Sequence, residues 1–127
     1  MYQATKLTLA LLAGFALGAG AIEALHAQAK RPAAYLVAEV EVTDPAGYQD
    51  YAKKAMPTID PYHTRFLARG KPDVVEGTPS KGNVLIFEFP SMDDAKQWYT
   101  TSPYKDLIAE RQKSANSRLY FVEGVAQ

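Results

Sequence analysis

The sequence predicts an α+β fold in which four antiparallel strands form one sheet and helices cover one of its faces. Two observations lead to this prediction. Two stretches, starting near residues 35 and 84, each resemble a strand that leads through a capping residue into an amphipathic helix. Each of these strand-helix units is followed by another short strand-like segment, so the order is strand, helix, strand, strand, helix, strand.

The N-terminal segment has the layout of a signal peptide. Lys6 precedes an apolar run over residues 7–22, which is shorter than the roughly 20 residues needed to span a bilayer. Small residues at the A-x-A spacing follow at 27–29 and predict cleavage after Ala29. We therefore expect a signal peptide over residues 1–29 and a folded domain over 30–127, in the periplasm or secreted. The alternative is an uncleaved signal anchor, and then only this segment contacts the membrane.

The first strand-helix unit follows a short polar link. Over residues 35–42, apolar side chains alternate with more polar ones, which is the period of a strand with two unlike faces. Asp44 can cap a helix that has Pro45 at its first position, and apolar residues then recur at spacings of three and four through Ile59. Pro57 cannot continue the helical hydrogen bonds, so a kink or a break is expected there.

The middle of the chain predicts two more strands. Residues 65–69 form a short strand that ends at Gly70, and residues 73–76 either continue it or bend back. A turn is expected over 76–82. Residues 84–89 then read as a buried strand that stops at Pro90.

The second helix and the last strand complete the order. Ser91 and Asp94 supply a capping box, and Ser102 with Pro103 restarts the helix with a fresh cap. Residues 118–123 form the final strand. Two crossovers of this length give the ferredoxin-like βαββαβ arrangement, with a four-stranded antiparallel sheet and both helices on one face.

The face of this sheet that turns away from the helices is too apolar to remain in water. Its expected apolar members are Val37, Leu67, Val84, Ile86, Tyr120 and Val122. A domain of this size also gains core by self-association. We therefore predict a homodimer in which two sheets pack face to face.

Composition excludes several function classes. The 127 residues, 47% of them hydrophobic, suffice for one ordinary domain. Lys and Arg total 14, as do Asp and Glu, so no net charge attracts nucleic acid. The chain has no cysteine, and after removal of the signal segment only His63 remains of its two histidines. A protein metal site is therefore not expected, and no cofactor is predicted.

The order and spacing of several short motifs resemble the domain-of-unknown-function family numbered 1330 over residues 34–124. The motifs are residues 40–45 with Tyr48 and Tyr51, residues 68–70, 76–77 and 88–91, Ala95 with Trp98, Tyr99, Ser102 and Tyr104, and residues 122–124. The resemblance implies a dimeric α+β barrel, similar to antibiotic-biosynthesis monooxygenases, muconolactone isomerase, EthD-like proteins and haem-handling barrels. It implies no settled reaction. The chain departs from the family pattern in its added signal peptide and in Lys71, which stands where a second glycine is expected.

Polar side chains on the sheet give the first set of candidate site residues. Glu39, Arg69 and Glu88 are expected on sheet faces buried between subunits, with Tyr120 and Arg118 nearby. A desolvated carboxylate there could act as a general acid or base near neutral pH. The alternative is an Arg–Glu pair that only satisfies itself in the interface.

The helices give the second set. Arg111 falls on the apolar stripe of the last helix, where it could bind a substrate carboxylate, pair with Glu123, or extend to the sheet edge. His63 follows the first helix and could serve as an acid-base group or a haem ligand, or only interact with the helix terminus. Aromatic residues recur at helical spacing and form core, with two or three able to line a pocket for a flat ligand. They are Tyr48, Tyr51, Trp98, Tyr99 and Tyr104.

Two functions are consistent with these residues. The first is a small metal-independent enzyme, similar to a monooxygenase or isomerase, that acts on a small carbonyl, lactone or phenolic compound. In it Glu39, Glu88 or His63 is catalytic, and Arg69, Arg111, Tyr51, Trp98 and Tyr120 bind a small aromatic or acidic ligand. The second is a non-catalytic periplasmic protein that binds a small molecule or haem.

Overall fold

The computed structural model describes residues 31–126, so the predicted signal peptide lies outside the described residues. Residues Pro32–Val125 form one compact unit. Its elements are β1 (Ala34–Val42), α2 (Pro45–Ala55), the 3-10 helix η1 (Met56–Tyr62), β2 (Arg65–Gly70), β3 (Asn83–Phe89), α3 (Met92–Thr100), the 3-10 helix η2 (Tyr104–Leu107), α4 (Ile108–Ser114) and β4 (Ala115–Glu123). No helix in this part of the chain is long and apolar enough to cross a membrane.

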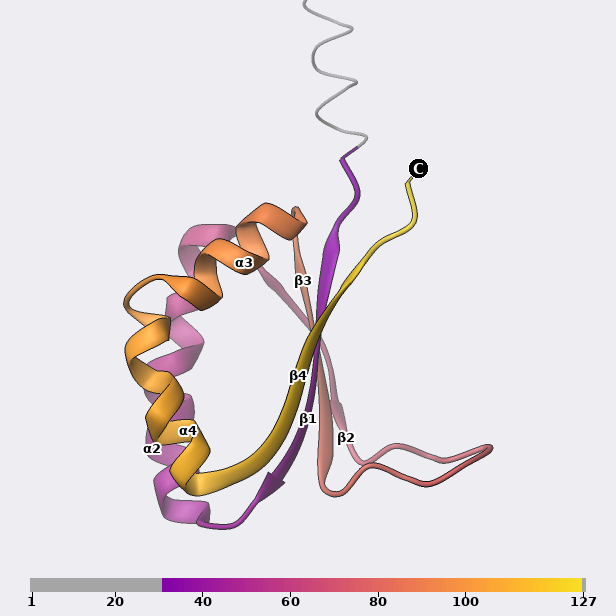
Figure 1. Ribbon diagram of the computed structural model, residues 1–127, viewed down its shortest axis with the longest axis vertical. Helices are drawn as coiled ribbons and strands as arrows, with labels where there is room; N and C mark the ends of the chain where they lie inside the picture. The colour runs from indigo at the N-terminus through magenta and orange to yellow at the C-terminus, as the bar shows by residue number, and fades with distance from the viewer. Residues whose placement is uncertain (1–30, 127) are drawn as a thin grey trace, which may run out of the picture. The chain divides into compact units, whose positions relative to one another are not determined.

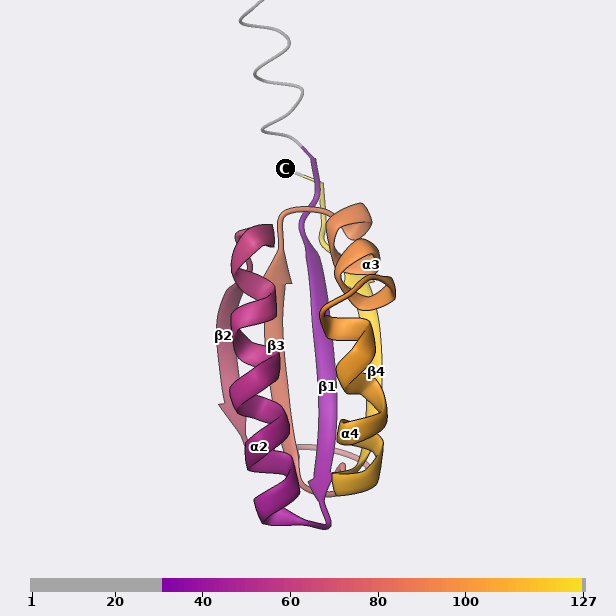
Figure 2. The same cartoon turned by 90° about the vertical axis from the view of Figure 1, so that its left-hand side faces the viewer.

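The strands form a four-stranded antiparallel sheet in the order β2-β3-β1-β4, and the helices lie on one face of it (Figure 1). Seen from the helix side, α2 runs over the β2–β3 half of the sheet and α3 with α4 over the β1–β4 half (Figure 2). This is the ferredoxin-like α+β fold, so the predicted fold class is confirmed.

The expected caps begin both helical regions. The Asp44 carboxylate accepts a hydrogen bond from the backbone N–H of Gly47 at 3.2 Å, and Pro45 occupies the first turn of α2. The Ser91 hydroxyl accepts from the backbone N–H of Asp94 at 3.2 Å and begins α3. Near Pro57 the α-helix gives way to the 3-10 helix η1, as the proline predicts.

Two predicted boundaries are wrong, and one pair of alternatives is decided. The last strand begins at Ala115 rather than at residue 118, because the chain passes directly from α4 into β4. Residues 71–82 contain no strand, so residues 73–76 do not continue β2. After Ser102 and Pro103 the chain forms η2 without a side-chain cap, and the α-helix resumes only at Ile108.

A β-bulge in β2 corrects the predicted position of Arg69. Phe66 lies opposite Phe87, but the next paired residues are Ala68 opposite Ile86 and Arg69 opposite Leu85. One extra residue on a strand moves every later side chain to the other face. Arg69 therefore lies on the helix side of the sheet and not, as strict alternation predicts, on the face with Glu39 and Glu88.

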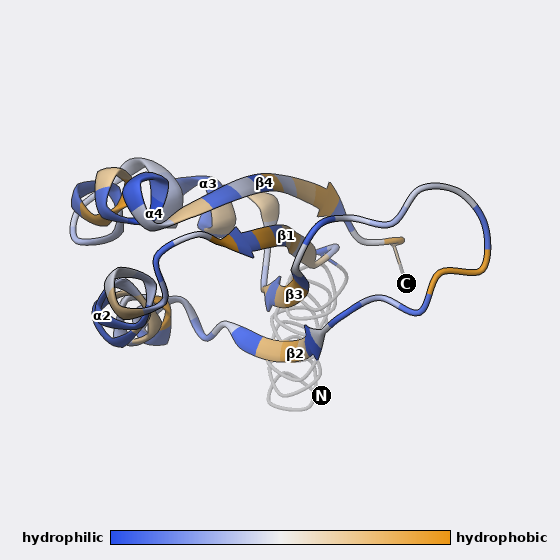
Figure 3. Cartoon of the chain, turned by 90° about the horizontal axis from the view of Figure 1, so that it is seen from below, coloured by the Kyte–Doolittle hydropathy of each residue, from blue (hydrophilic) through white to orange (hydrophobic). Residues whose placement is uncertain are grey.

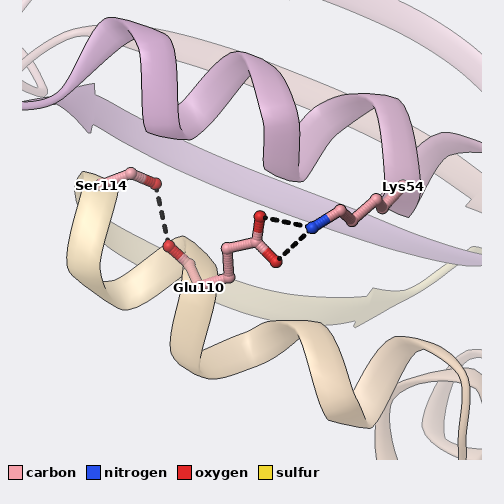
Figure 4. A network of polar contacts seen from close by, with 3 residues as sticks. All are labelled: Lys54, Glu110 and Ser114. Atoms are coloured by element: carbon pink, nitrogen blue, oxygen red, sulfur yellow. Dashed lines mark hydrogen bonds and ion pairs between the residues drawn. The ribbon is translucent and has the colours of Figure 1, made fainter.

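The core lies between the sheet and the helices. Its largest fully buried side chains include Tyr104 and Phe89, and Trp98 packs against both, with ring centroids 3.8 Å from Tyr104 and 5.4 Å from Phe89. The helices also touch at the surface, where the Lys54 ammonium of α2 donates to the Glu110 carboxylate of α4 at 3.1 Å (Figure 4). Stacked and tilted aromatic rings therefore form a large part of the core beneath the helices.

None of the helices within residues 31–126 lies on the second face of the sheet (Figure 1). Tyr120 and Val122 of β4 are 45% and 49% exposed on it. The loop between β2 and β3 extends on this same side and has a hydrophobic stretch near its tip (Figure 3). Within that loop Val75 is 94% exposed. In the single chain, apolar side chains on this face are therefore exposed to water. The charged residues of the face cover only part of this apolar surface.

Candidate functional site

An apolar cavity of about 210 Å³ lies between the sheet and the helices. Leu36 and Ala38 of β1, Leu85 of β3 and Leu119 of β4 form part of its sheet wall. Helix α2 contributes Tyr48 and Tyr51, and Trp98 and Tyr104 also line it. An engineered apolar cavity of about 150 Å³ holds benzene, so this one has room for a single-ring molecule.

Among the described residues that line the cavity, Arg69 is the only charged one. It is exposed, so it stands at the mouth rather than at the floor. No side-chain hydrogen bond or ion pair with another described residue is found for it. The β2 bulge therefore places an unpaired guanidinium beside an apolar pocket, which is the combination that binds an acidic group on a hydrophobic molecule.

A buried chain of polar groups forms one side of the cavity. The Arg111 Nη1 donates to the Tyr104 hydroxyl at 2.7 Å, and the Tyr104 and Tyr51 hydroxyls lie 2.7 Å apart. Arg111 is only 5% exposed and Tyr104 only 1%. Helix α4 thus places the Arg111 guanidinium behind the aromatic side chains of the cavity wall. The position of Arg111 on the apolar stripe of the helix predicts this inward orientation.

Burial shapes the titration of this cluster. Burial raises the pKa of Tyr51, and the neighbouring Tyr104 raises it further, while the charge of Arg111 opposes the rise. Burial also raises the pKa of Tyr48, against the lowering effect of Arg111 and Arg69. For Arg111 the loss of solvent lowers the pKa, but the tyrosine oxygens, led by Tyr104, outweigh it and the net direction is upward. At neutral pH both phenols are therefore protonated donors and Arg111 is a cation.

The two predicted carboxylates lie on the open face of the sheet and are paired. Arg118 binds Glu39 directly across β1 and β4, with its Nη2 2.7 Å from Oε2. Arg65 lies 3.5 Å from Glu88 across β2 and β3. Neither glutamate lines the cavity on the helix side. Both pairs fit the alternative that these charges satisfy each other.

A second, open hollow of about 460 Å³ lies on that face, between the β2–β3 loop and the ends of β1 and β4. The Glu39–Arg118 pair lines it together with Ser80 and Lys81 of the loop. Its lining is more polar than that of the cavity. Because Arg118 already pairs with Glu39 and the hollow is open to solvent, it encloses a ligand less than the cavity does.

The remaining predicted site residues are dispersed. His63 ends η1 in a left-handed conformation, with φ 54°, and lines neither the cavity nor the hollow. Tyr120 stands half-exposed on the open face. The described residues contain no group of three His, Cys, Asp or Glu side chains that could hold a metal ion. Of the predicted set, Arg69, Tyr51 and Trp98 line the cavity, and Arg111 reaches it through Tyr104.

Sequence reasoning did not single out Tyr48 and Tyr104 from the other aromatic residues. Their spacing only shows that they face the sheet, because Tyr48 and Tyr51 are three residues apart on α2. Tyr104 differs from the other aromatic residues in the contact of its hydroxyl with Arg111, which lies seven positions further along the chain. Such a contact depends on how η2 joins α4 and is not a periodic pattern.

Solved structures share this fold. A protein of unknown function from Rhodopseudomonas palustris is 15% identical with a TM-score of 0.61, over 83% of this chain and 94% of that chain. SnoaB, a cofactor-independent oxygenase from Streptomyces nogalater, is 9% identical with a TM-score of 0.52, over 76% of this chain and 96% of its own. A dimeric ferredoxin-like protein of unknown function from Thermobifida fusca is 10% identical with a TM-score of 0.50, over 74% and 92%. At these identities the likeness concerns the fold alone.

Sequence comparison identifies the family. No curated protein matches the chain. The model of the family described as a domain of unknown function, DUF1330, matches residues 33–125, which is the whole folded unit apart from its first residue. The chain therefore belongs to the DUF1330 family.

Proposed function

We propose that the protein binds a compact, mainly apolar molecule with one acidic group in the cavity between the sheet and the helices. The observation that supports this most is the position of Arg69, an unpaired cation at the mouth of an otherwise uncharged aromatic cavity. A single ring fits the volume, and a carboxylate or an acidic enol or phenol matches the guanidinium.

The single tryptophan supplies the test, since Trp98 lines the cavity and no other tryptophan contributes to the emission. We expect benzoate to change Trp98 fluorescence saturably. Arg69→Gln should weaken this binding roughly tenfold, because it removes a charge-assisted hydrogen bond. Arg65→Gln is the matched control, since it removes an arginine of the same strand that pairs with Glu88 on the other face. An equal affinity of Arg69→Gln and the unaltered protein would contradict the proposal.

A second candidate is a cofactor-independent enzyme that acts on a small carbonyl, lactone or phenolic compound. SnoaB, which shares the fold, is described as a cofactor-independent oxygenase. In this chain Arg69 could stabilise the oxyanion of an enol or a phenol. No acidic side chain or histidine is among the residues that line the cavity, so the proton must pass to water. This geometry favours binding over catalysis.

Exchange of carbon-bound protons separates the two candidates. Enolisation of phenylpyruvate in heavy water replaces its methylene protons with deuterium, which proton NMR records. Catalysis predicts faster exchange than in buffer and loss of that gain in Arg69→Gln. If exchange proceeds at the buffer rate and benzoate binds, the protein binds ligands without catalysing enolisation.

We further propose that the protein acts as a homodimer outside the cytoplasm. The uncovered sheet face with Tyr120 and Val122 supports the dimer, and one structural neighbour is described as a dimeric ferredoxin-like protein. Export rests on the sequence of residues 1–29. Fractionation of cells that produce the full chain tests it, and recovery of an unprocessed protein in the cytoplasm would contradict it.

A further inference from the structure

We propose that the buried Arg111 orients the Tyr51 hydroxyl so that it donates a hydrogen bond into the cavity, which therefore selects ligands with an accepting oxygen, such as a ketone or an oxyanion. This inference rests on the proposed binding function and adds a second polar anchor to it, separate from Arg69.

The first step is the direction of the bond between Arg111 and Tyr104. A guanidinium has donors and no acceptor, so the 2.7 Å contact from Nη1 uses a lone pair of the Tyr104 oxygen. Arg111 forms no ion pair with a described acidic residue, although it is 5% exposed. Its charge is therefore stabilised by phenolic oxygen and not by a carboxylate.

The second step is the hydrogen of Tyr104. This residue is 1% exposed, so its O–H cannot turn to bulk water and needs an acceptor inside the protein. The Tyr51 oxygen, 2.7 Å away, is the acceptor available among the described residues. Because buried donors are almost always satisfied, Tyr104 donates to Tyr51.

The third step is the hydrogen of Tyr51. Its oxygen already accepts from Tyr104, and no further acceptor for its O–H is found among the described residues. Tyr51 lines the cavity, and we infer that its free donor turns to the space that a ligand would fill. Burial and the nearby Tyr104 raise its pKa, which keeps the hydrogen on the oxygen at neutral pH.

The cation at the start of the chain strengthens the last donor. In a hydrogen-bonded chain each bond polarises the next, and the effect is larger where solvent is excluded. Arg111 thus acts as a positioning residue, because its hydrogen-bonded link to the ligand runs through Tyr104 and Tyr51. A donor of this kind stabilises a bound carbonyl oxygen or oxyanion. It does not stabilise a bound hydrocarbon of the same shape, which has no acceptor.

Two neutral probes of matched shape test the inference without involving Arg69. Cyclohexanone carries an accepting oxygen, and methylenecyclohexane has a carbon in its place. Titration calorimetry should show that the unaltered protein binds the ketone more tightly. Tyr51→Phe should lower the affinity for the ketone about three- to tenfold and leave that for the hydrocarbon unchanged. Tyr62→Phe is the control, since Tyr62 does not line the cavity.

The infrared carbonyl band of bound cyclohexanone tests the contribution of Arg111. A stronger donor lowers its wavenumber. We expect the wavenumber of the band to be higher in Arg111→Met than in the unaltered protein. In Arg111→Lys, which restores the cation, the wavenumber should return most of the way to the value of the unaltered protein. Tyr104→Phe should raise it as well, since the link is broken. A purely structural role of Arg111 would not move the band of a ketone that still binds.

The outcomes separate this inference from the proposed function. If neither probe nor benzoate binds, the cavity is not a ligand site and both are overturned. If both probes bind and Tyr51→Phe leaves their affinity ratio unchanged, only the inference is overturned. Thermal melting of each variant identifies any that lose the fold, and Tyr51→Phe keeps the ring that packs in the core.

Discussion

The Trp98 indole donates a hydrogen bond to the Thr58 hydroxyl at 2.9 Å, between helix α3 and the 3-10 helix η1. The Thr58 hydroxyl in turn donates to the backbone carbonyl of Ala55 at 2.6 Å. Both side chains are buried. This pair fixes the orientation of the tryptophan that stacks on Tyr104 and lines the cavity.

Thr58→Val should therefore destabilise the fold. The change keeps the shape of the side chain but leaves the indole N–H without an acceptor, which costs about 1–3 kcal/mol for a buried donor. Urea unfolding followed by Trp98 emission measures the free energy. Thr100→Val is the control, because its hydroxyl is exposed and bonds only within its own helix. An equal loss in both variants would argue against the Trp98–Thr58 bond.

Two glycines with positive φ should differ sharply in their tolerance of alanine. Gly82 has φ +84°, and a Cβ there would lie 2.1 Å from the backbone oxygen of Val40, while Gly77 with φ +86° has open space around it. We expect Gly77→Ala to cost about 1–2 kcal/mol from backbone strain alone. Gly82→Ala should cost at least about 1–2 kcal/mol more, since β1 must shift. Equal unfolding free energies would contradict the close approach of this turn to β1.

Stability should fall at alkaline pH through the buried phenols. The pKa of Tyr51 is raised from 10.0 in the folded chain, so between pH 10 and its folded value only the unfolded chain loses the proton. Stability is unaffected below the unfolded pKa and decreases as the pH rises above it, by up to about 1.4 kcal/mol per pH unit for each such tyrosine. Urea midpoints from pH 8 to 11 measure this. Tyr51→Phe should make the fall shallower, and Tyr62→Phe should not.

Charge on the open sheet face should dissociate the proposed dimer. A lysine at Val122 would be desolvated against the second copy, so Val122→Lys should raise the dissociation constant at least tenfold (about 1.4 kcal/mol). Sedimentation velocity at micromolar concentration measures the assembly. Val125→Lys is the control, since Val125 lies beyond the end of β4 and is 85% exposed. A folded single chain before any substitution would overturn the dimer.

The ion pair between the helices should contribute little. Lys54 and Glu110 have exposed side-chain fractions of 58% and 33%, so solvent screens their attraction. Glu110→Gln should therefore lower the unfolding free energy by less than about 1 kcal/mol, and less still at high salt. A larger loss would mean that the contact in Figure 4 positions α4 against α2.

Local chemistry made most of the fold predictable. The helix starts depend on residues in the first turn or just before it, namely Asp44, Pro45 and Ser91. The alternation of side chains along β1 and β3 is regular. The start of β4 was not predictable, because residues 115–117 continue the polar character of the preceding helix and no glycine or proline separates the two. There the pairing with β1 decides the structure.

The candidate site was predictable only in part. Tyr51, Trp98 and Arg111 follow helical periodicity, and periodicity alone turns them toward the sheet. The Glu39–Arg118 and Glu88–Arg65 pairs depend on strand register, which the sequence does not specify. Arg69 depends on the bulge, and strict alternation assigns it to the opposite face.

That bulge ties the chemistry of the cavity to the number of residues in β2. Loss of Leu67 would restore regular pairing with β3 and keep Arg69 opposite Leu85, on the cavity side. One residue added between Ala68 and Arg69 would instead turn the Arg69 guanidinium to the open face, although every residue of the wall remained the same. The strand lies at the edge of the sheet, where a shift of this kind disturbs only one neighbour. A single-residue insertion at this point, rather than a substitution, is thus a change that would remove the anion site in one step.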